Sequence, residues 1–206
     1  MKTVNTKKLV LTAALLALVL LFGLTPLGLI PLGFINVTLL CLPVIIGAIY
    51  AGPGVGLILG LCFGLTSVLS AFGVSMVPQS ALAGALVAKS PLLAVVMSMV
   101  PRALVPLAAS LVYRAVGKGA RSVKAVLPAA VAGSLVNTLF YLGLMLLFYV
   151  LTGLDAAAVL GVIGGTGLIA GGAEAVVAAL VCTPVLAALF QLDHNRKESA
   201  NHDHGD

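Results

Sequence analysis

Three strongly polar residues, Arg102, Asn137 and Glu174, lie inside long apolar stretches of this 206-residue chain. Placing an ionisable side chain in the middle of a membrane span costs at least about 2.5–3.5 kcal/mol, so such residues are candidates for function. Arg102 lies about eleven residues from the start of its segment, and Asn137 lies about eleven residues from the start of the next one, which runs in the opposite direction. Each residue of a helix adds about 1.5 Å along its axis. Glu174 is near the middle of the last segment. All three therefore fall near one level, and we expect them to converge on one pocket.

Two interpretations of this cluster are open. In the structural one, Arg102 and Glu174 form a buried ion pair, and Asn137 satisfies the remaining hydrogen bonds. In the functional one, Arg102 binds an anionic substrate group in bidentate fashion, while Asn137 and Glu174 contact amides or hydroxyls. The two are compatible, because an empty site can pair its charges until substrate arrives. Gln79, in a stretch between apolar segments, is a further candidate for substrate contact.

The composition indicates what kind of scaffold holds these residues. Hydrophobic residues make up 61% of the chain and charged residues 8%, and the mean hydropathy is +1.22. Such values are typical of a polytopic membrane protein, and a chain of this length holds roughly six spans of about 20 residues. We expect an all-α integral membrane protein with one membrane domain, residues 1–192. The polar tail, residues 193–206, is expected to be disordered, with loose metal binding by its His and Asp side chains as the less favoured alternative.

Prolines, glycines and charges divide the membrane domain into six apolar segments. Asn36 is a candidate N-cap of the second segment. The sequence Ala51-Gly52-Pro53-Gly54 predicts a tight turn between the second and the third. The last segment exceeds one span, so its glycine-rich start is expected at the surface or to be irregular. The segments are Leu9–Thr25, Asn36–Tyr50, Gly54–Phe72, Pro91–Tyr113, Val126–Leu151 and Ala157–Phe190.

The basic residues predict how these helices are oriented. Cytoplasmic loops of membrane proteins carry an excess of Lys and Arg. If both termini are inside, nine of the eleven basic residues are cytoplasmic and the outer loops hold only Lys89. We therefore predict six transmembrane helices with the N- and C-termini both in the cytoplasm. The inner basic residues are Lys2, Lys7, Lys8, Arg114, Lys118, Arg121, Lys124, Arg196 and Lys197.

Two Pro-Leu-Gly steps stand in the first predicted outer loop, residues 26–35. Their prolines are Pro26 and Pro31, their glycines are Gly28 and Gly33, and the loop carries no charge. Irregular backbone near membrane depth is tolerated only where protein or a water-filled cavity surrounds it. We therefore expect this loop, and the longer apolar loop 73–90, to fold over the pocket. Proline stiffness and glycine turns favour a lid at 26–35, with a simple connector as the alternative.

Small residues on the first segment allow close helix packing. Ala13 and Ala17 lie four apart, a spacing that lets helices approach closely in lipid, either within the protein or against a partner. The chain holds no G-x-x-x-x-G-K-[ST], H-E-x-x-H or G-x-S-x-G motif, and its three cysteines lie within apolar runs. We expect a binding protein and not an enzyme, with no cofactor, no metal and no nucleic-acid partner.

Several stretches resemble the substrate-binding S components of energy-coupling factor (ECF) vitamin transporters, above all the pantothenate-type group. They are "TPLGLIPLGFINVTLLCLPVIIGAIYAGPGVGLILGLCFGLTS", "VPRALV", "GSLVNTLFYLG" and the final "EAVVAAL". The resemblance covers about residues 9–190. It implies a multi-pass protein of the prokaryotic plasma membrane that captures a small vitamin outside and docks on a membrane T component driven by two cytosolic ATPases. It further implies that Ala13 and Ala17 form the docking surface, and that the vitamin lies near the outer side under the loops.

Two other functions are weighed against this one. A stand-alone proton-coupled carrier would use Glu174 as its titrating group, but the sequence shows no internal repeat of the kind that supports alternating access in many such carriers. A membrane enzyme or assembly factor would ordinarily cluster Asp, His or Lys near one interface. The inner loop 114–124 is instead basic and free of acids.

Overall fold

The computed structural model describes residues 6–31, 36–118 and 121–202, and this part of the chain is almost entirely helical. Five of its helices are long and apolar enough to span a membrane, and a shorter apolar helix accompanies them. At this level the prediction of an all-α membrane protein is confirmed. The helices are α1 (Thr6–Leu24), α2 (Cys41–Tyr50), α3 (Pro53–Ala71), α4 (Ala81–Lys89), α5 (Pro91–Gly117), α6 (Val126–Thr152), α7 (Ala156–Val162) and α8 (Leu168–His202).

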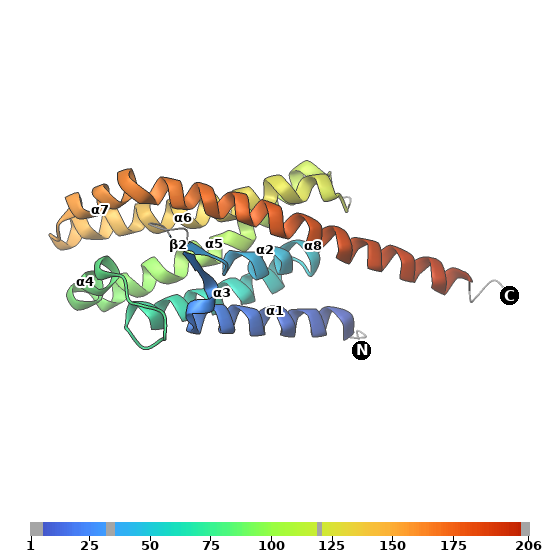
Figure 1. Ribbon diagram of the computed structural model, residues 1–206, viewed down its shortest axis with the longest axis horizontal. Helices are drawn as coiled ribbons and strands as arrows, with labels where there is room; N and C mark the ends of the chain where they lie inside the picture. Colours follow the sequence, from blue (N-terminus) through green and yellow to red (C-terminus); the bar gives the residue numbers. More distant parts are fainter. Residues whose placement is uncertain (1–5, 32–35, 119–120, 203–206) are drawn as a thin grey trace.

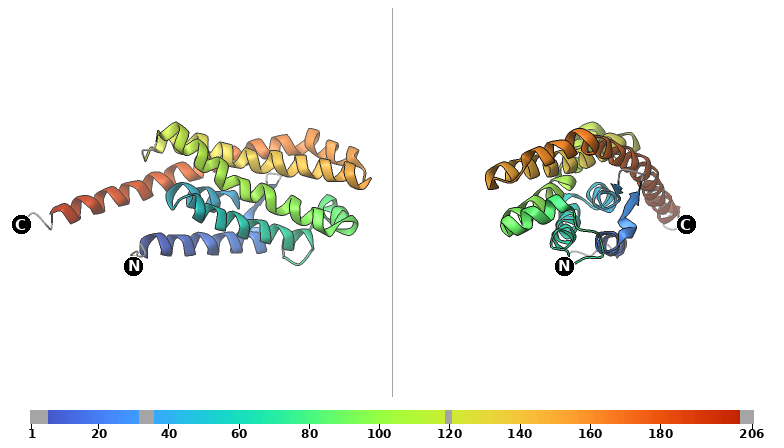
Figure 2. Two further views of the ribbon diagram at one scale, coloured as in Figure 1. Left: turned by 180° about the vertical axis from the view of Figure 1, so that it is seen from behind. Right: turned by 60° about the vertical axis from the view of Figure 1, so that its left-hand side comes forward.

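The long helices run side by side along one axis (Figures 1 and 2). The start of α1 and the end of α8 lie at one end of the bundle, and α4 and α7 lie at the other (Figure 1). We call the first the Asp193 end, because Asp193 of α8 contacts Lys7 of α1 there, and the second the α4 end. The last turns of α8 extend beyond the other helices. The predicted domain boundary at residue 192 therefore falls inside a continuous helix, where a disordered tail was expected.

Local sequence explains where several helices begin and end. Gly52, with φ at 112°, precedes Pro53 at the first position of α3. Glycine tolerates this left-handed backbone, and proline suits the first turn of a helix. The tight turn predicted between the second and third segments is thus confirmed. The side chain of Asp155 accepts a hydrogen bond from the backbone N–H of Ala157 and so caps α7.

The second apolar segment begins differently from the prediction. Residues Asn36–Thr38 form strand β2, which pairs antiparallel with β1 (Leu29–Pro31) after a 3₁₀ turn, η1 (Pro26–Gly28). Asn36 is therefore not an N-cap. The helix α2 begins at Cys41, and Leu40 precedes it without a side-chain cap. Prolines prevent a helix through 26–31, so the backbone groups of this stretch pair across a short hairpin.

The last apolar segment is also interrupted. Between α7 and α8 lies one π-helical turn, η3 (Ile163–Gly167), with three glycines among its five residues. Glycine holds the α-helical backbone weakly, and π turns are often found near functional sites. The expected irregular start of this segment is therefore present. A further difference is that α4 occupies half of the predicted loop 73–90, and another short 3₁₀ turn, η2 (Val123–Ala125), precedes α6.

Glycines allow α3 to approach α5 closely. Gly56, Gly60 and Gly64 follow one another at four-residue spacing. A Cβ atom at Gly60 would lie 2.6 Å from the carbonyl oxygen of Arg102, and one at Gly56 would lie 2.8 Å from the Cβ of Pro106. Such small residues let two helices pack backbone against backbone in a membrane. This contact fixes the part of α5 from which Arg102 projects.

Candidate functional site

A cavity of about 300 Å³ lies among α3, α5, α6 and α8, on the α4 side of the bundle's middle. Residues of α1, β2, α4 and η3 also line it. Arg102, Asn137 and Glu174 are all among its lining residues, so helix packing brings to one cavity the three side chains that the sequence places at one level. Their roles in binding stay predictions. The polar lining residues are Thr38, Thr66, Ser67, Ser70, Ser80, Ser98, Arg102, Asn137, Thr138, Tyr141 and Glu174.

Arg102 is held in place by a backbone carbonyl that the neighbouring proline leaves free. Pro101 lies inside α5 and has no N–H to give to the carbonyl of Met97 one turn earlier. The guanidinium of Arg102 donates to that carbonyl, with Nη1 at 3.3 Å from the oxygen. The rings of Tyr141 and Phe63 lie 4.4 and 5.3 Å from its Cζ atom, within the range of cation–π attraction. Its Nε is buried without a hydrogen-bond partner among the described residues.

Asn137 of α6 lines the same cavity as Arg102. Its side chain is 6% exposed, and its Oδ1 atom has no hydrogen-bond partner in the described part of the chain. The hydroxyl of Ser134, one turn earlier on α6, is likewise buried and unpartnered there. Leaving a buried polar atom unpaired costs roughly 1–3 kcal/mol. Ser134 does not line the cavity, whereas Asn137 and Arg102 both do. The Oδ1 of Asn137 and the Nε of Arg102, which lack partners among the described residues, are therefore an acceptor and a donor that a bound molecule would satisfy.

Glu174 has hydrogen-bond partners, but Arg102, the partner that the ion-pair interpretation requires, is not among them. Its Oε1 accepts from the backbone N–H and the hydroxyl of Thr38, at 3.0 and 2.8 Å, and its Oε2 accepts from Thr138 at 3.3 Å. No ion pair between described residues joins Glu174 to Arg102. The predicted pair is thus not formed, because the hydroxyls and an amide of nearer elements supply the hydrogen bonds. The contact with Thr38 ties strand β2 to α8.

A comparison with protein families decides what kind of molecule carries this cavity. The family model described as "ECF transporter, substrate-specific component" matches residues 7–187. The chain belongs to this family. It is therefore a multi-pass membrane protein and a transporter subunit, not an enzyme, and the stand-alone carrier is set aside. No curated protein matches the chain.

Gln79 of this S component is not among the residues that line the cavity, and its role in substrate contact stays a prediction. Its side-chain Nε2 donates to the backbone carbonyl of Ala71, and its amide packs against Gly84, where an added Cβ would lie 3.1 Å away. The side chain therefore holds the connection between α3 and α4 in place. The neighbouring Pro78 and Ser80 are the residues of this connection that reach the cavity. A polar residue in a loop does not reveal from sequence which way it points.

None of the described residues of the predicted lid, 26–31, lines the cavity of the S component, but Thr38 of β2, which follows the lid, does. Pro26 is exposed, and Gly28 is buried against Phe22, where an added Cβ would lie 2.8 Å from the backbone carbonyl carbon. Phe22 itself lines the cavity. Pro31 ends strand β1, and Gly33 lies outside the described residues. The role of this segment as a lid stays a prediction.

Sequence reasoning missed three residues that shape the site. Tyr141 stacks against Arg102, and Thr38 and Thr138 donate to Glu174. Thr138 and Tyr141 lie one and four positions after Asn137, so helical spacing alone would have placed Tyr141 on the same face. Thr38 carries no comparable signal, because it is 136 residues from Glu174.

The first helix of the S component exposes its small residues. Ala13, Ala14 and Ala17 are exposed, whereas the buried residues of α1 are Leu15, Val19 and Gly23 on its other face. In the described structure the Ala13 and Ala17 pair is therefore not used for internal packing. This face is free for a partner, and the identity of that partner stays a prediction.

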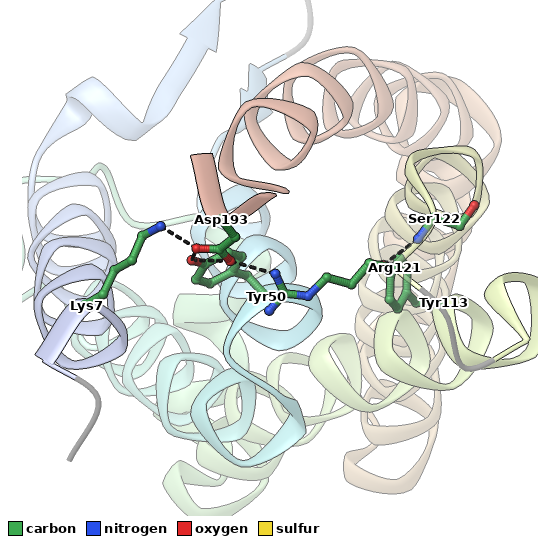
Figure 3. A network of polar contacts seen from close by, with 6 residues as sticks. All are labelled: Lys7, Tyr50, Tyr113, Arg121, Ser122 and Asp193. Atoms are coloured by element: carbon green, nitrogen blue, oxygen red, sulfur yellow. Dashed lines mark hydrogen bonds and ion pairs between the residues drawn. The ribbon is translucent and has the colours of Figure 1, made fainter. Parts of the chain in front are cut away.

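A second polar cluster lies at the Asp193 end (Figure 3). Asp193 is bound by Lys7 of α1, by Tyr50 at the end of α2 with its hydroxyl 2.9 Å away, and by Arg121 with Nη1 at 2.6 Å. It lies in the tail that was expected to be disordered. Four separate parts of the S component meet at this one carboxylate.

Proposed function

We propose that this S component captures a small carboxylate vitamin, with pantothenate as the leading candidate, and passes it to an ECF transporter. The observation that carries the proposal is the pair of unpartnered atoms, Nε of Arg102 and Oδ1 of Asn137, in one cavity. A ligand that fits them must bring an acceptor for the arginine and an N–H or O–H donor for the asparagine. A carboxylate joined to amide or hydroxyl groups has both.

The rest of the lining supports the same class of ligand. Guanidinium groups bind carboxylates through two parallel hydrogen bonds. Seven hydroxyl side chains of Ser and Thr line the cavity in addition to Tyr141, and they can donate to and accept from amides and alcohols. The volume of about 300 Å³ is at the lower end of the range of ligand pockets, roughly 300–1,000 Å³. These features favour a small, hydroxylated and acidic molecule over a large planar one.

The orientation in the membrane follows from the basic residues. Arg114, Lys118, Arg121 and Lys124 lie in or next to the connection between α5 and α6, at the same end as Lys7. We infer that the Asp193 end faces the cytoplasm, as the positive-inside rule requires. The cavity then lies in the outer half of the protein, and the β1–β2 hairpin and the connection between α3 and α4 cover it as lids.

The partners follow from the family and from the exposed face of α1. We propose that a T component packs against Ala13 and Ala17, and that two ATPases bound to it supply the energy. Support comes from the exposure of both alanines on a helix that is apolar along its whole length. In lipid, such small residues allow a second helix to approach closely.

The ligand proposal is tested by identifying what the protein binds. Full-length protein is purified in mild detergent, and the small molecules that accompany it are identified by mass spectrometry. We expect a carboxylate with amide or hydroxyl groups, and titration of that compound should give saturable one-to-one binding. A ligand without an anionic group, bound with equal affinity by wild type and by Arg102→Ala, would overturn the proposal.

The docking proposal needs a separate measurement. Ala17→Trp should leave ligand affinity unchanged and reduce ATP-driven uptake in vesicles that contain the T component and ATPases, because the ring holds the partner helix away. The matched control is Leu18→Trp, which is also exposed on α1 but lies about 100° around the helix from Ala17. Normal uptake and normal complex formation by Ala17→Trp would contradict the assignment of this surface.

A further inference from the structure

A second hollow lies on the outside of the bundle between α5 and α6. Its volume is about 380 Å³, and it shares no residue with the central cavity. Its walls are formed by Leu104, Leu107 and Leu111 of α5 and by Phe140 of α6, and Arg114 lines it as well. We call it the Arg114 groove.

The spacing along α5 explains the shape of the Arg114 groove. Leu104, Leu107, Leu111 and Arg114 follow one another at intervals of three, four and three residues, which places them on one face of a helix. They extend over about 15 Å at a rise of 1.5 Å per residue. Because α5 ends at the Asp193 end, Arg114 lies at that end of the groove and the leucines lie toward the middle of the membrane span.

The wall of the groove faces outward. Leu107, Leu111 and Phe140 are 46%, 70% and 47% exposed, on helices that are long and apolar enough to span a membrane. Their surroundings are therefore lipid chains. An apolar trough in that position fits an acyl chain along its length.

The polar end of the groove holds a cation that has no partner in the described part of the chain. Ser110, the other polar lining residue, already donates to the carbonyl oxygen of Ala48 at 3.4 Å. Arg114 has no hydrogen bond or ion pair to any residue in the described ranges. The nearby Arg121, in contrast, is bound to Asp193. The first acidic residue of the whole chain is Asp155, so no carboxylate of the α5–α6 connection competes for Arg114.

We propose that the Arg114 groove binds one anionic phospholipid, with an acyl chain against the leucines and the phosphate on Arg114. An apolar trough that ends in an unpaired guanidinium complements the two parts of such a lipid, and Lys118 and Lys124 add positive potential at the same end. Basic pockets beside membrane helices attract anionic headgroups, and each Lys or Arg near the membrane surface strengthens that binding about fivefold. The inference does not depend on the substrate of the central cavity.

The test uses the full-length protein, freed of lipid in detergent and then supplied with either phosphatidylglycerol or phosphatidylcholine of identical acyl chains. Native mass spectrometry measures how much lipid is retained. Wild type should retain phosphatidylglycerol preferentially, and Arg114→Gln should bind it about fivefold more weakly, the factor for one cation near an anionic surface. Leu107→Trp, which fills the trough without changing charge, should also lower retention. Lys8→Gln, which removes an exposed cation of α1 outside the groove, should not.

Any one of four results would overturn the proposal. If wild type retained both lipids equally, or if Arg114→Gln retained as much phosphatidylglycerol as wild type, the groove would make only non-specific contact with the bilayer. Displacement of the lipid by millimolar inorganic phosphate would indicate a site for free phosphate and not for a lipid. Unchanged lipid binding together with lost assembly of the transporter in Arg114→Gln would make the groove a docking surface for a protein partner.

Discussion

Two polar clusters of this S component are built from similar residues but are completed differently. At the Asp193 end, both carboxylate oxygens are occupied, Oδ1 by Lys7 and Oδ2 by Arg121, and Tyr50 donates to the pair (Figure 3). In the central cavity, Nε of Arg102 and Oδ1 of Asn137 have no partner among the described residues. The first cluster is complete within the folded chain. The second leaves two groups open, as a binding site for a ligand would.

The two clusters also differ in their access to water. The side chains of Lys7 and Arg121 are 32% and 52% exposed, so their ion pairs with Asp193 are screened and each contributes little to stability. Asn137 is 6% exposed, and an unsatisfied group in such a position is costly. A buried polar group without a partner is tolerated where a bound ligand satisfies it. The comparison therefore predicts that changes in the cavity alter affinity, and changes at the Asp193 end alter stability.

The largest effect is expected for Arg102→Ala. Removing one side of a buried, hydrogen-bonded charge pair costs about 2–5 kcal/mol, so the affinity for the proposed carboxylate ligand should fall at least about thirtyfold. Isothermal titration of purified protein with the ligand found by mass spectrometry measures this. Thermal unfolding without ligand should change little, because the same change removes a desolvated charge.

Arg121→Ala is the matched control for that variant. Arg121 also lies over two aromatic rings, those of Tyr50 and Phe190, at 5.7 and 5.5 Å, yet it does not line the central cavity. Its loss should leave affinity unchanged. If both arginine variants bound ligand as wild type does, the assignment of the cavity as the binding site would be wrong.

A smaller loss of affinity is expected for Asn137→Leu. The ligand's N–H or O–H donor would be buried without its acceptor, which costs about 1–3 kcal/mol and lowers affinity roughly five- to 150-fold. The unliganded protein should be as stable as wild type or more so, since leucine has the same branched shape and removes an unpaired polar atom. Titration and thermal unfolding of the same preparation show both effects. Lower stability with unchanged affinity would mean that Asn137 has a structural role.

Thr38→Val tests whether the hairpin closes the site through Glu174. The substitution keeps the shape of the side chain and removes the hydroxyl that donates to Oε1 at 2.8 Å. A hydrogen bond to a charged group is worth about 1.5–3 kcal/mol, part of which the backbone N–H of Thr38 retains. We expect about a tenfold faster release of ligand, measured by stopped-flow dissociation. Thr38→Ser should restore the wild-type rate, and a normal rate in Thr38→Val would make the hairpin a connector only.

Some of this site was accessible from the sequence because membrane spans are regular. Counting residues from the ends of apolar runs placed Arg102, Asn137 and Glu174 at one level, since every residue of a helix adds the same rise. The partners of Glu174 were not accessible in that way. Thr38 reaches it from a short hairpin whose strand was assigned to a helix, and a three-residue strand has almost no periodicity of its own.

The surroundings of Gln79 and Asp193 differ from what their sequence context indicated, for a common reason. Both are polar residues in stretches that looked solvated, and polarity was taken as a sign of orientation or of disorder. In the folded chain Gln79 donates to a backbone carbonyl and Asp193 gathers two cations. The partners of Asp193 come from elements far apart in sequence, so composition within a window does not reveal them. The partner of Gln79 is only eight residues away, but the turn that brings the two together has no periodicity. The tail of α8 remains helical because its first polar residues are held by α1 and by the α5–α6 connection.

The smallest effect is expected for Asp193→Asn. The amide can still accept from Tyr50 but no longer pairs with two cations, and partly exposed pairs contribute little, so the midpoint of thermal unfolding should fall by about 2–4 °C. Ligand affinity should be unchanged. High salt screens exposed charges, so in 1 M NaCl the difference from wild type should largely vanish, whereas the loss of affinity in Asn137→Leu should persist. The two clusters lie about 28 Å apart along α8 at its helical rise. An Asp193→Asn variant that kept its stability but bound ligand more weakly would show that they are coupled. The division between a structural cluster and a binding cluster would then be wrong.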